Sequence, residues 1–147
     1  MIMSNFSGEQ LVILGVAKSD SHAVANHLIA MQLRAHGFRV VNLGVCTPLH
    51  EFANAFDRHP DAEAILIGSL NGHARQDLED LPTLRAAGRL GCPVIVGGNL
   101  SVGSGAKDCD ELRLYQLGVD HVLNTPSELL LLLDALHAAR NLELQRG

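Results

Sequence analysis

Leu11-Val12-Ile13-Leu14-Gly15-Val16 is a short, continuously apolar run that is rich in β-branched residues. Such a run is typical of a strand buried on both faces, as in a parallel sheet with helices on either side. A polar turn follows at 18–22, and the apolar positions then recur with a helical period from Ala23 to Gly37, where a helix-ending glycine is expected. The stretch therefore predicts a strand–turn–helix unit, the repeating element of α/β proteins.

The same unit recurs along the rest of the chain. Further apolar runs predict strands at 38–43, 64–67, 94–96 and 121–123, and helical patterns follow each of them at 47–58, 78–90, 108–117 and 126–141. The last helix begins at Thr125-Pro126-Ser127-Glu128, a capping box with proline at the first helical position. The alternation predicts a doubly wound α/β fold whose five-stranded parallel sheet has the flavodoxin-like order 2-1-3-4-5. In the last helix, the leucine run 129–133 predicts core contacts with an exposed remainder.

Length and composition indicate one domain that folds unaided. The chain has 147 residues, of which 47% are hydrophobic and 18% charged. This is enough material for one core, so we expect a single domain over 1–147 with its core at about 10–141. Three cysteines, Cys46, Cys92 and Cys109, stand far apart, which fits a reduced compartment better than a disulfide framework.

Charge and hydropathy exclude two classes of partner. The net charge is −5, and the 11 Lys and Arg residues are scattered, unlike the basic patch of a nucleic-acid-binding protein. No run approaches the roughly 20 apolar residues of a membrane span, and the first ten residues carry no leader pattern. We therefore expect a cytoplasmic protein with no nucleic-acid or membrane partner.

The carboxyl ends of the predicted strands argue against three common ligand classes. The first turn holds only Gly15, where a dinucleotide fingerprint needs three spaced glycines. The loop 98–104 has phosphate-loop spacing, but Ser104 stands where lysine is required. The segment 68–70 lacks the aspartate of a phosphorelay receiver. With no Trp and one Tyr, the chain also offers little aromatic surface. We expect a ligand to be held by backbone, small polar residues and histidine.

Asp20-Ser21-His22 follows the first strand and permits two interpretations. A carboxylate two residues away can accept a hydrogen bond from one imidazole nitrogen and leave the other free to bind a metal. Alternatively, Asp20 caps the following helix and His22 is an ordinary first-turn residue. The other seven histidines add no second ligand at close spacing, so a zinc site built from protein alone is disfavoured. A single protein ligand suits a metal that arrives in its own macrocycle.

Three motifs stand in register at the ends of three predicted strands. They are Asp20-x-His22, Gly68-Ser69-Leu70 and Gly97-Gly98. They resemble the pattern D-x-H-x-x-G, S-x-L and G-G of cobalamin-binding domains, and the segments 19–24, 37–45 and 96–100 resemble the small subunit of glutamate mutase. Two positions depart from the pattern. Ala25 replaces its last glycine and Gly68 replaces its serine, so we expect weaker contacts to the nucleotide tail of the cofactor.

The resemblance implies how the cofactor is bound. His22 becomes the lower axial ligand of cobalt, Asp20 orients its ring, and the displaced nucleotide tail enters a slot lined by small residues. The residues that the resemblance assigns to the cofactor are Ser19, Asp20, Ser21, His22, Ala23, Ala25, Gly68, Ser69, Leu70, Gly97, Gly98, Asn99, Leu100, Ser101, Val102, Gly103 and Thr125.

The resemblance also implies a function. It predicts the adenosylcobalamin-binding subunit of a carbon-skeleton mutase, with the rearrangement of L-glutamate to 3-methylaspartate as the expected reaction. About ten residues precede the first strand, so we expect a separate large TIM-barrel subunit to cover the upper face of the corrin, in a heterotetramer. That subunit is expected to carry the substrate-binding groups, so no catalytic residue is assigned here and the chain alone is expected to be inactive. Two alternatives are a non-catalytic cobalamin carrier or sensor with a regulatory partner, and a flavodoxin-like domain that binds no corrin.

Overall fold

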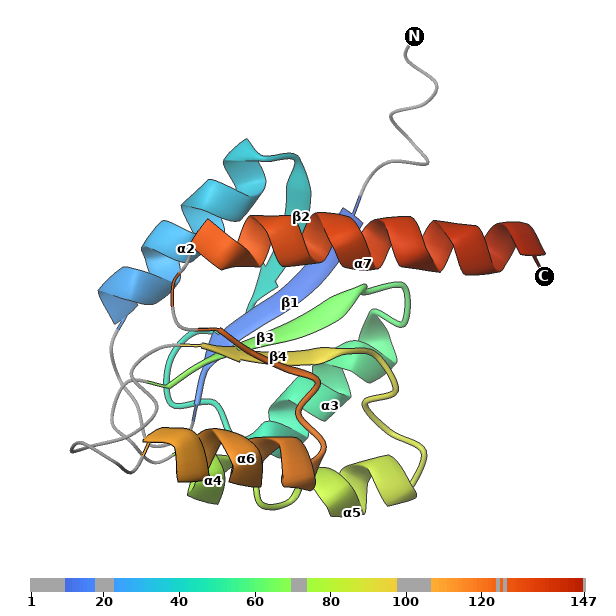
Figure 1. Ribbon diagram of the computed structural model, residues 1–147. Helices are drawn as coiled ribbons and strands as arrows, with labels where there is room; N and C mark the ends of the chain where they lie inside the picture. The colour runs from blue at the N-terminus through green and yellow to red at the C-terminus, as the bar shows by residue number, and fades with distance from the viewer. Residues whose placement is uncertain are drawn as a thin grey trace, which may run out of the picture.

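A computed structural model of the chain describes residues 10–17, 23–69, 74–97, 107–123, 125 and 127–146 (Figure 1). These residues form a parallel sheet flanked by helices. The strands are β1 (Gln10–Val16), β2 (Phe38–Asn42), β3 (Ala64–Gly68), β4 (Val94–Gly97) and β5 (His121–Leu123). The helices are α2 (Ala23–Ala35), α3 (Leu49–Arg58), α4 (Ala74–Asp77), α5 (Leu81–Ala86), α6 (Lys107–Leu117) and α7 (Ser127–Arg146).

The sheet confirms the predicted topology. Its order is β2-β1-β3-β4-β5, and every neighbouring pair is parallel. The register aligns Val16 with Gly68, Gly68 with Gly97, and Gly97 with Leu123. The last residues of four strands therefore lie in one row along the carboxyl edge, where ligands of such sheets bind.

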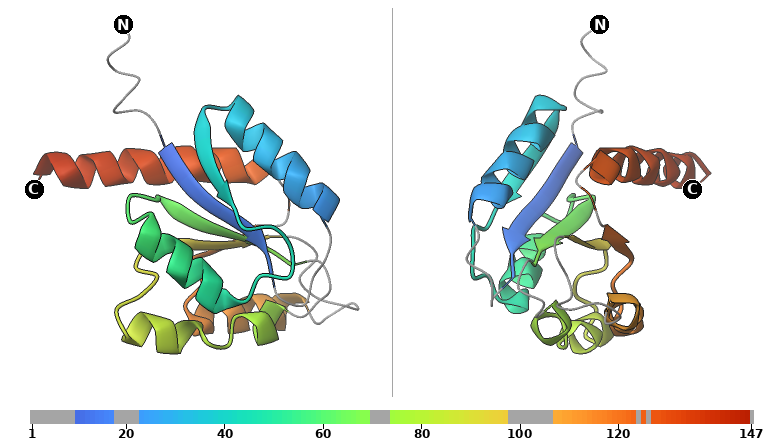
Figure 2. Two further views of the ribbon diagram at one scale, coloured as in Figure 1. Left: turned by 180° about the vertical axis from the view of Figure 1, so that it is seen from behind. Right: turned by 60° about the vertical axis from the view of Figure 1, so that its left-hand side comes forward.

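Helices cover both faces of the sheet, α2 and α7 on one side and α3 to α6 on the other (Figure 2). Alternate strand residues supply the two layers. Ile13, Ile65 and Val94 pack with the buried ring of Phe52 in the larger cluster. The smaller cluster contains Val12, Leu14, Leu66 and Ile95 from the strands and Ala30, Leu33, Leu129 and Leu133 from α2 and α7. Burial on both faces explains why the strands are continuous apolar runs.

Local signals for helix ends are also confirmed. Gly37 and Gly118 follow α2 and α6 with φ of +99° and +111°, a backbone conformation that favours glycine. At the start of α7, Glu128 Oε1 accepts a hydrogen bond from the backbone N–H of Thr125 at 3.2 Å, which is one half of the predicted capping box. No helix among the described residues has the length and apolar character that crossing a membrane requires.

Two helix predictions were wrong in their bounds. Within the predicted helix at 78–90 only 81–86 is helical, as α5, and a separate short helix, α4, precedes it at 74–77. Pro82 lies at the start of α5, and a proline there removes a backbone donor and blocks the helix from continuing through it. The last helix extends to Arg146, beyond the predicted end at 141. Within it, Leu129 and Leu133 are buried and Leu131 is 74% exposed, as the leucine run predicted.

Candidate functional site

Strands β3 and β4 both end in glycine at the carboxyl edge. Gly68 and Gly97 are register partners, and alternation places both on the face of Leu66 and Ile95, which packs against α2 and α7. If Gly68 carried a Cβ, its nearest neighbour among the described atoms would be Gly15 O, at 3.9 Å. A Cβ on Gly97 would have Leu123 O as its nearest described neighbour, at 3.7 Å. Packing among the described residues therefore does not require glycine at either position. Among the described residues, no side chain fills the space above Gly68 and Gly97 at the carboxyl end of this layer, and we call this space the open floor.

Gly15 offers a contrast on the other face of the sheet. A Cβ there would lie 2.7 Å from Cζ of Phe52, whose side chain is 1% exposed. This glycine is required by core packing. The glycines at the ends of β3 and β4 thus differ physically from the one inside β1.

Ser69 is a buried polar residue at the same edge. It is fully buried, and its hydroxyl has no hydrogen-bond partner among the described residues. Its backbone N–H donates to Gly97 O at 2.9 Å and so continues the ladder by one residue. Alternation then places its side chain on the face opposite the glycine pair, so the hydroxyl that is missing at Gly68 is not supplied by its neighbour.

Asn26, which sequence analysis did not single out, is a second buried polar residue near this edge. It lies in the first turn of α2 and is 4% exposed. Its Nδ2 donates to Asn42 Oδ1 at 2.9 Å, and the same oxygen accepts the backbone N–H of Gly44 at 3.0 Å. Asn26 Oδ1 is buried without a partner among the described residues. An unpaired buried amide oxygen costs about 1–3 kcal/mol, so such groups call for a ligand or another explanation.

The loop after β2 is held against the end of β1. Thr47 forms an isolated parallel bridge with Ala17, and its backbone N–H donates to Val16 O at 2.8 Å. Its buried hydroxyl donates to Gly44 O at 3.3 Å. Gly44 and the exposed Cys46 have positive φ, +86° and +52°. This loop therefore forms a fixed wall beside β1.

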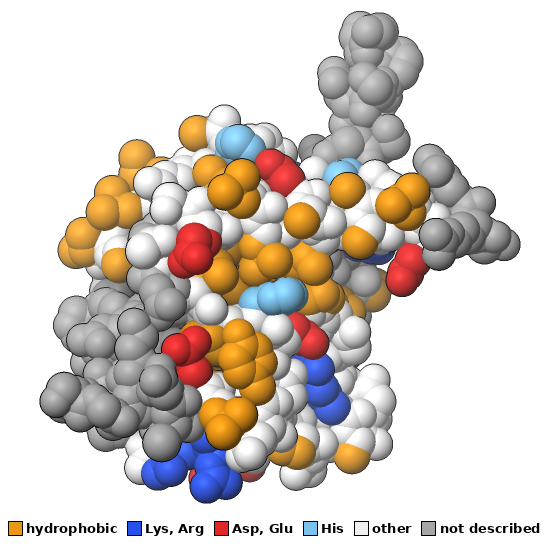
Figure 3. All heavy atoms as spheres, in the orientation of Figure 1, with side chains coloured by type: hydrophobic (Ala, Val, Ile, Leu, Met, Phe, Trp, Pro, Cys, Tyr) orange, Lys and Arg blue, Asp and Glu red, His pale blue; other side chains and the backbone are white. Residues whose placement is uncertain are grey.

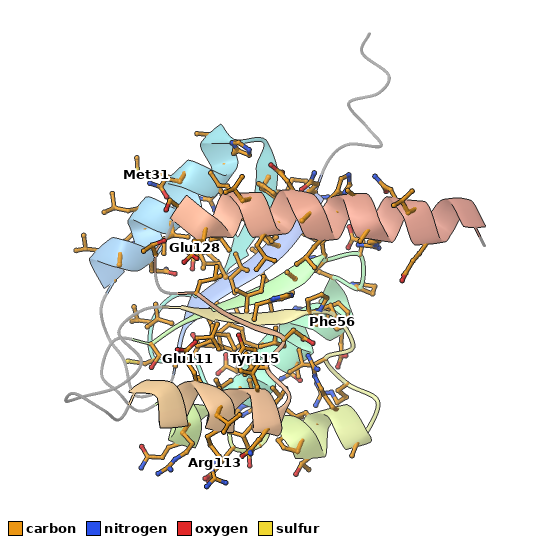
Figure 4. The ribbon with its side chains drawn as sticks, viewed as in Figure 1. Met31, Phe56, Glu111, Arg113, Tyr115 and Glu128 are labelled. Atoms are coloured by element: carbon orange, nitrogen blue, oxygen red, sulfur yellow. The ribbon has the colours of Figure 1, made fainter. Side chains whose placement is uncertain are left out.

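Six residues of the predicted cofactor site lie in the described part of the chain. Gly68, Ser69 and Gly97 lie at the carboxyl edge, and Ala23 and the exposed Ala25 lie in the first turn of α2. Thr125 lies between β5 and α7, next to Glu128, which Figure 4 labels at the start of α7. The structure thus brings these positions to one end of the molecule.

The remaining predicted site residues lie outside the described residues. They are Ser19, Asp20, Ser21, His22, Leu70, Gly98, Asn99, Leu100, Ser101, Val102 and Gly103. The two interpretations of Asp20 and His22 are therefore not tested by the structure. Within the ranges that are described, no cluster of three or more His, Cys, Asp or Glu side chains is arranged to hold a metal ion.

Comparison with known proteins identifies relatives over most of the chain. Residues 10–127 match the family model of the B12 binding domain. Glutamate mutase sigma subunit 1 of Haloarcula marismortui is 43% identical over 117 residues, which cover 80% of this chain and 77% of the relative. The glutamate mutase sigma subunit of Halobacterium salinarum is 40% identical over 124 residues, 84% of this chain and 83% of the relative. The glutamate mutase sigma subunit of Treponema denticola is 39% identical over 120 residues, which cover 80% of this chain and 86% of the relative.

Solved structures support the fold. A cobalamin-binding protein from Desulfitobacterium hafniense superposes with a TM-score of 0.66 at 18% identity, over 91% of this chain and 59% of that chain. The methanol:cobalamin methyltransferase complex of Methanosarcina barkeri gives a TM-score of 0.64 at 20% identity, over 90% and 45%. The chain thus spans about half the length of these solved chains.

Proposed function

This chain belongs to the B12-binding domain family and, within it, to the glutamate mutase sigma subunits, and on that premise we propose that it is the cobalamin-binding subunit of an adenosylcobalamin-dependent glutamate mutase. The observation that carries the proposal is the open floor at Gly68 and Gly97, where neighbouring strands end without side chains and nothing described fills the space. The same two positions belong to the motifs that the sequence shares with cobalamin-binding domains.

The residues present fit a cobalamin. Glycines at the ends of β3 and β4 place no side chain of their own between the sheet and α2 and α7, and a buried, unpaired amide oxygen of Asn26 lies at the same carboxyl edge, beside the end of β2. We propose that His22 binds the cobalt through one ring nitrogen and that Asp20 accepts a hydrogen bond from the other ring N–H. Asp20 then fixes the tautomer and raises the basicity of the ring.

Adenosylcobalamin, when bound, supplies the radical that starts the rearrangement of L-glutamate to 3-methylaspartate, through homolysis of its cobalt–carbon bond. This chain contributes binding and orientation. We assign no catalytic residue to it, because the groups that hold the substrate belong to the large subunit in this proposal. The alternative of a carrier or sensor has no specific observation in its favour.

We propose that the partner is a large TIM-barrel subunit in a heterotetramer, seated on the carboxyl edge. The adjoining helix α2 provides part of its contact surface. Val24, Leu28 and Met31 are 72%, 54% and 64% exposed and stand three or four residues apart on one side of the helix, where hydrophobic side chains gather in Figure 3. Arg34 is the only charged residue in α2. A solvated helix face normally carries charges, so this apolar stripe indicates a contact surface.

The size of the stripe favours the large subunit over a second copy of this chain. Three side chains supply on the order of a few hundred Å², whereas a specific interface buries roughly 1,000 Å² or more. The stripe must therefore belong to a wider interface. The stripe begins at Val24, at the end of α2 that adjoins the carboxyl edge. We therefore propose that the interface continues over this edge, where the large subunit covers the upper face of the corrin.

The axial role of His22 can be tested by electron paramagnetic resonance. Cob(II)alamin bound to nitrogen-15-labelled protein is expected to show coupling to a protein nitrogen, because the ring of His22 replaces the cofactor's own base. His22→Ala is expected to abolish this coupling. Asp20→Asn is expected to retain it while weakening cofactor affinity about 10–100-fold, the usual effect of losing the partner of a metal-binding histidine. Coupling only to unlabelled benzimidazole would contradict the proposal.

A further inference from the structure

We propose that Asn26 Oδ1 accepts a hydrogen bond from the bound cobalamin, so that Asn26 is a cofactor-binding residue outside the recognised motifs. The inference rests on the proposed function, since it names a contact of the same cofactor. It begins from a group that the chain leaves unpaired. Asn26 is 4% exposed, its Nδ2 is already bonded to Asn42, and its Oδ1 has no partner in the described part of the protein.

The position of Asn26 fits this role. It is the fourth residue of α2, so it lies at the end of the helix that joins the carboxyl edge. Asn42, its partner, is the last residue of β2 at that same edge.

Asn26 also faces the layer that the glycine pair leaves open. It is buried together with Ala30 and Leu33, the α2 residues that pack in the smaller cluster. Gly68 and Gly97 face the same cluster from the sheet, by alternation with Leu66 and Ile95. The unpaired oxygen and the open floor thus lie on one face of the sheet, the first beside the end of β2 and the second at the ends of β3 and β4.

The hydrogen bonds around Asn26 fix which atom faces a ligand. Asn42 Oδ1 accepts from both Gly44 N–H and Asn26 Nδ2, so it must be an oxygen and its neighbour on Asn26 must be the amide nitrogen. Asn26 therefore presents an acceptor. The complementary ligand group is an N–H or O–H donor.

Cobalamin carries such donors at its corrin and on its tail. Primary carboxamides surround the corrin, the linker to the tail carries a secondary amide N–H, and the nucleotide adds a ribose hydroxyl. The donor is one of these, and a corrinoid without the nucleotide tail distinguishes the two sources. Cobinamide has the corrin carboxamides and lacks the nucleotide.

The test compares Asn26→Leu with Asn42→Ala in the full chain, by titrating hydroxocobalamin and following the change in its absorption spectrum. Both variants break the hydrogen bond between Asn26 and Asn42, and only the first removes the unpaired oxygen. We expect Asn26→Leu to weaken cobalamin binding about tenfold and Asn42→Ala to weaken it less than about threefold. Far-ultraviolet circular dichroism and urea unfolding of each variant give the folded fraction used to correct the affinities.

Asn26→Asp is the second variant, because it keeps an acceptor oxygen in the same place. It is expected to bind cobalamin more tightly than Asn26→Leu, and it serves alone if the leucine variant does not fold. Loss of cobinamide affinity in Asn26→Leu would place the donor on the corrin carboxamides or the linker amide, and loss restricted to cobalamin would place it on the nucleotide.

Equal losses in Asn26→Leu and Asn42→Ala would overturn the inference, because the hydrogen bond between the two asparagines would then account for the whole effect. Unchanged affinity in Asn26→Leu would also overturn it. Neither result touches the proposed function, because that function is tested by cobalamin binding of the unaltered chain.

Discussion

At Gly68 the chain has no hydroxyl where the resembled S-x-L motif has serine, and no described atom blocks a side chain there. A Cβ at this position meets no described atom closer than 3.9 Å, and Ser69 lies on the opposite face. Gly68→Ser is therefore expected to fold normally and to tighten cobalamin binding about two- to tenfold, through one added hydrogen bond. Spectroscopic titration measures the affinity.

Gly68→Ala is the matched control for that substitution. It adds the same Cβ without the hydroxyl, so its affinity is expected to match or fall below that of the unaltered chain. If serine tightens binding no more than alanine does, this protein has built its tail pocket around glycine.

Cys92, which precedes β4 and is 8% exposed, gives a prediction about pH. Burial raises the pKa of its thiol from 9.0 to about 12. The folded protein keeps this proton at pH values where the unfolded chain has lost it. The resulting stability is therefore complete below about pH 9 and is lost as the pH rises toward 12. Urea unfolding can be followed between about pH 8 and pH 10.5, a range around the pKa of a free thiol. Over this range the free energy of unfolding is expected to fall more steeply with pH for the unaltered chain than for Cys92→Ala. Parallel curves would contradict the assignment.

Asn26 shows what the sequence could and could not indicate at the scale of a residue. Helical spacing puts it on the same face as Ala30 and Leu33, whereas the apolar positions Val24, Leu28 and Met31, which helped to predict this helix, lie on its exposed side. The sequence did not indicate the partner of Asn26. Asn42 lies 16 residues away at the end of β2, and only the folded chain brings the two amides to 2.9 Å.

At the scale of elements, the strands were predictable because burial on both faces requires a continuous apolar run in each strand. The order of the sheet was predictable because strands and helices alternate along the chain. The prediction of a helix at 78–90 was wrong in both bounds. Apolar spacing continues through Pro82, but this proline lies at the start of a new short helix. The segments 18–22 and 98–106, which carry most of the predicted cofactor site, lie outside the described residues. Their assignment still rests on the motifs.

The apolar stripe of α2 gives a prediction at the same scale. Leu28→Glu places a charge in the middle of Val24, Leu28 and Met31, where a partner must remove it from water. We expect this variant to bind cobalamin normally and to associate at least about tenfold more weakly with the large subunit. Leu142→Glu is the control, since Leu142 is 57% exposed near the far end of α7. Equal association of the two variants would remove α2 from the interface.

For the whole molecule, the row of strand ends makes the carboxyl edge a single surface. The end of α2, the loop held by Thr47 and the paired glycines all meet there. A cofactor seated on this edge contacts both this chain and whatever protein covers it. Assembly with the large subunit is therefore expected to depend on adenosylcobalamin, because a ligand that binds the complex better than the free chains must strengthen their association by the same factor.

Sedimentation of the mixed subunits with and without adenosylcobalamin tests this dependence, and conversion of L-glutamate to 3-methylaspartate is assayed in the same mixtures. We expect a larger sedimenting species and turnover only when both chains and the cofactor are present. His22→Ala is expected to lose both together, because the coupling runs through the bound cofactor, whereas Leu28→Glu is expected to lose association while still binding cobalamin. Association that ignores the cofactor, or turnover by this chain alone, would contradict the shared-cofactor interface. Cofactor-dependent assembly without glutamate turnover would keep the interface and reject the substrate, since we propose that the substrate-binding groups belong to the other subunit.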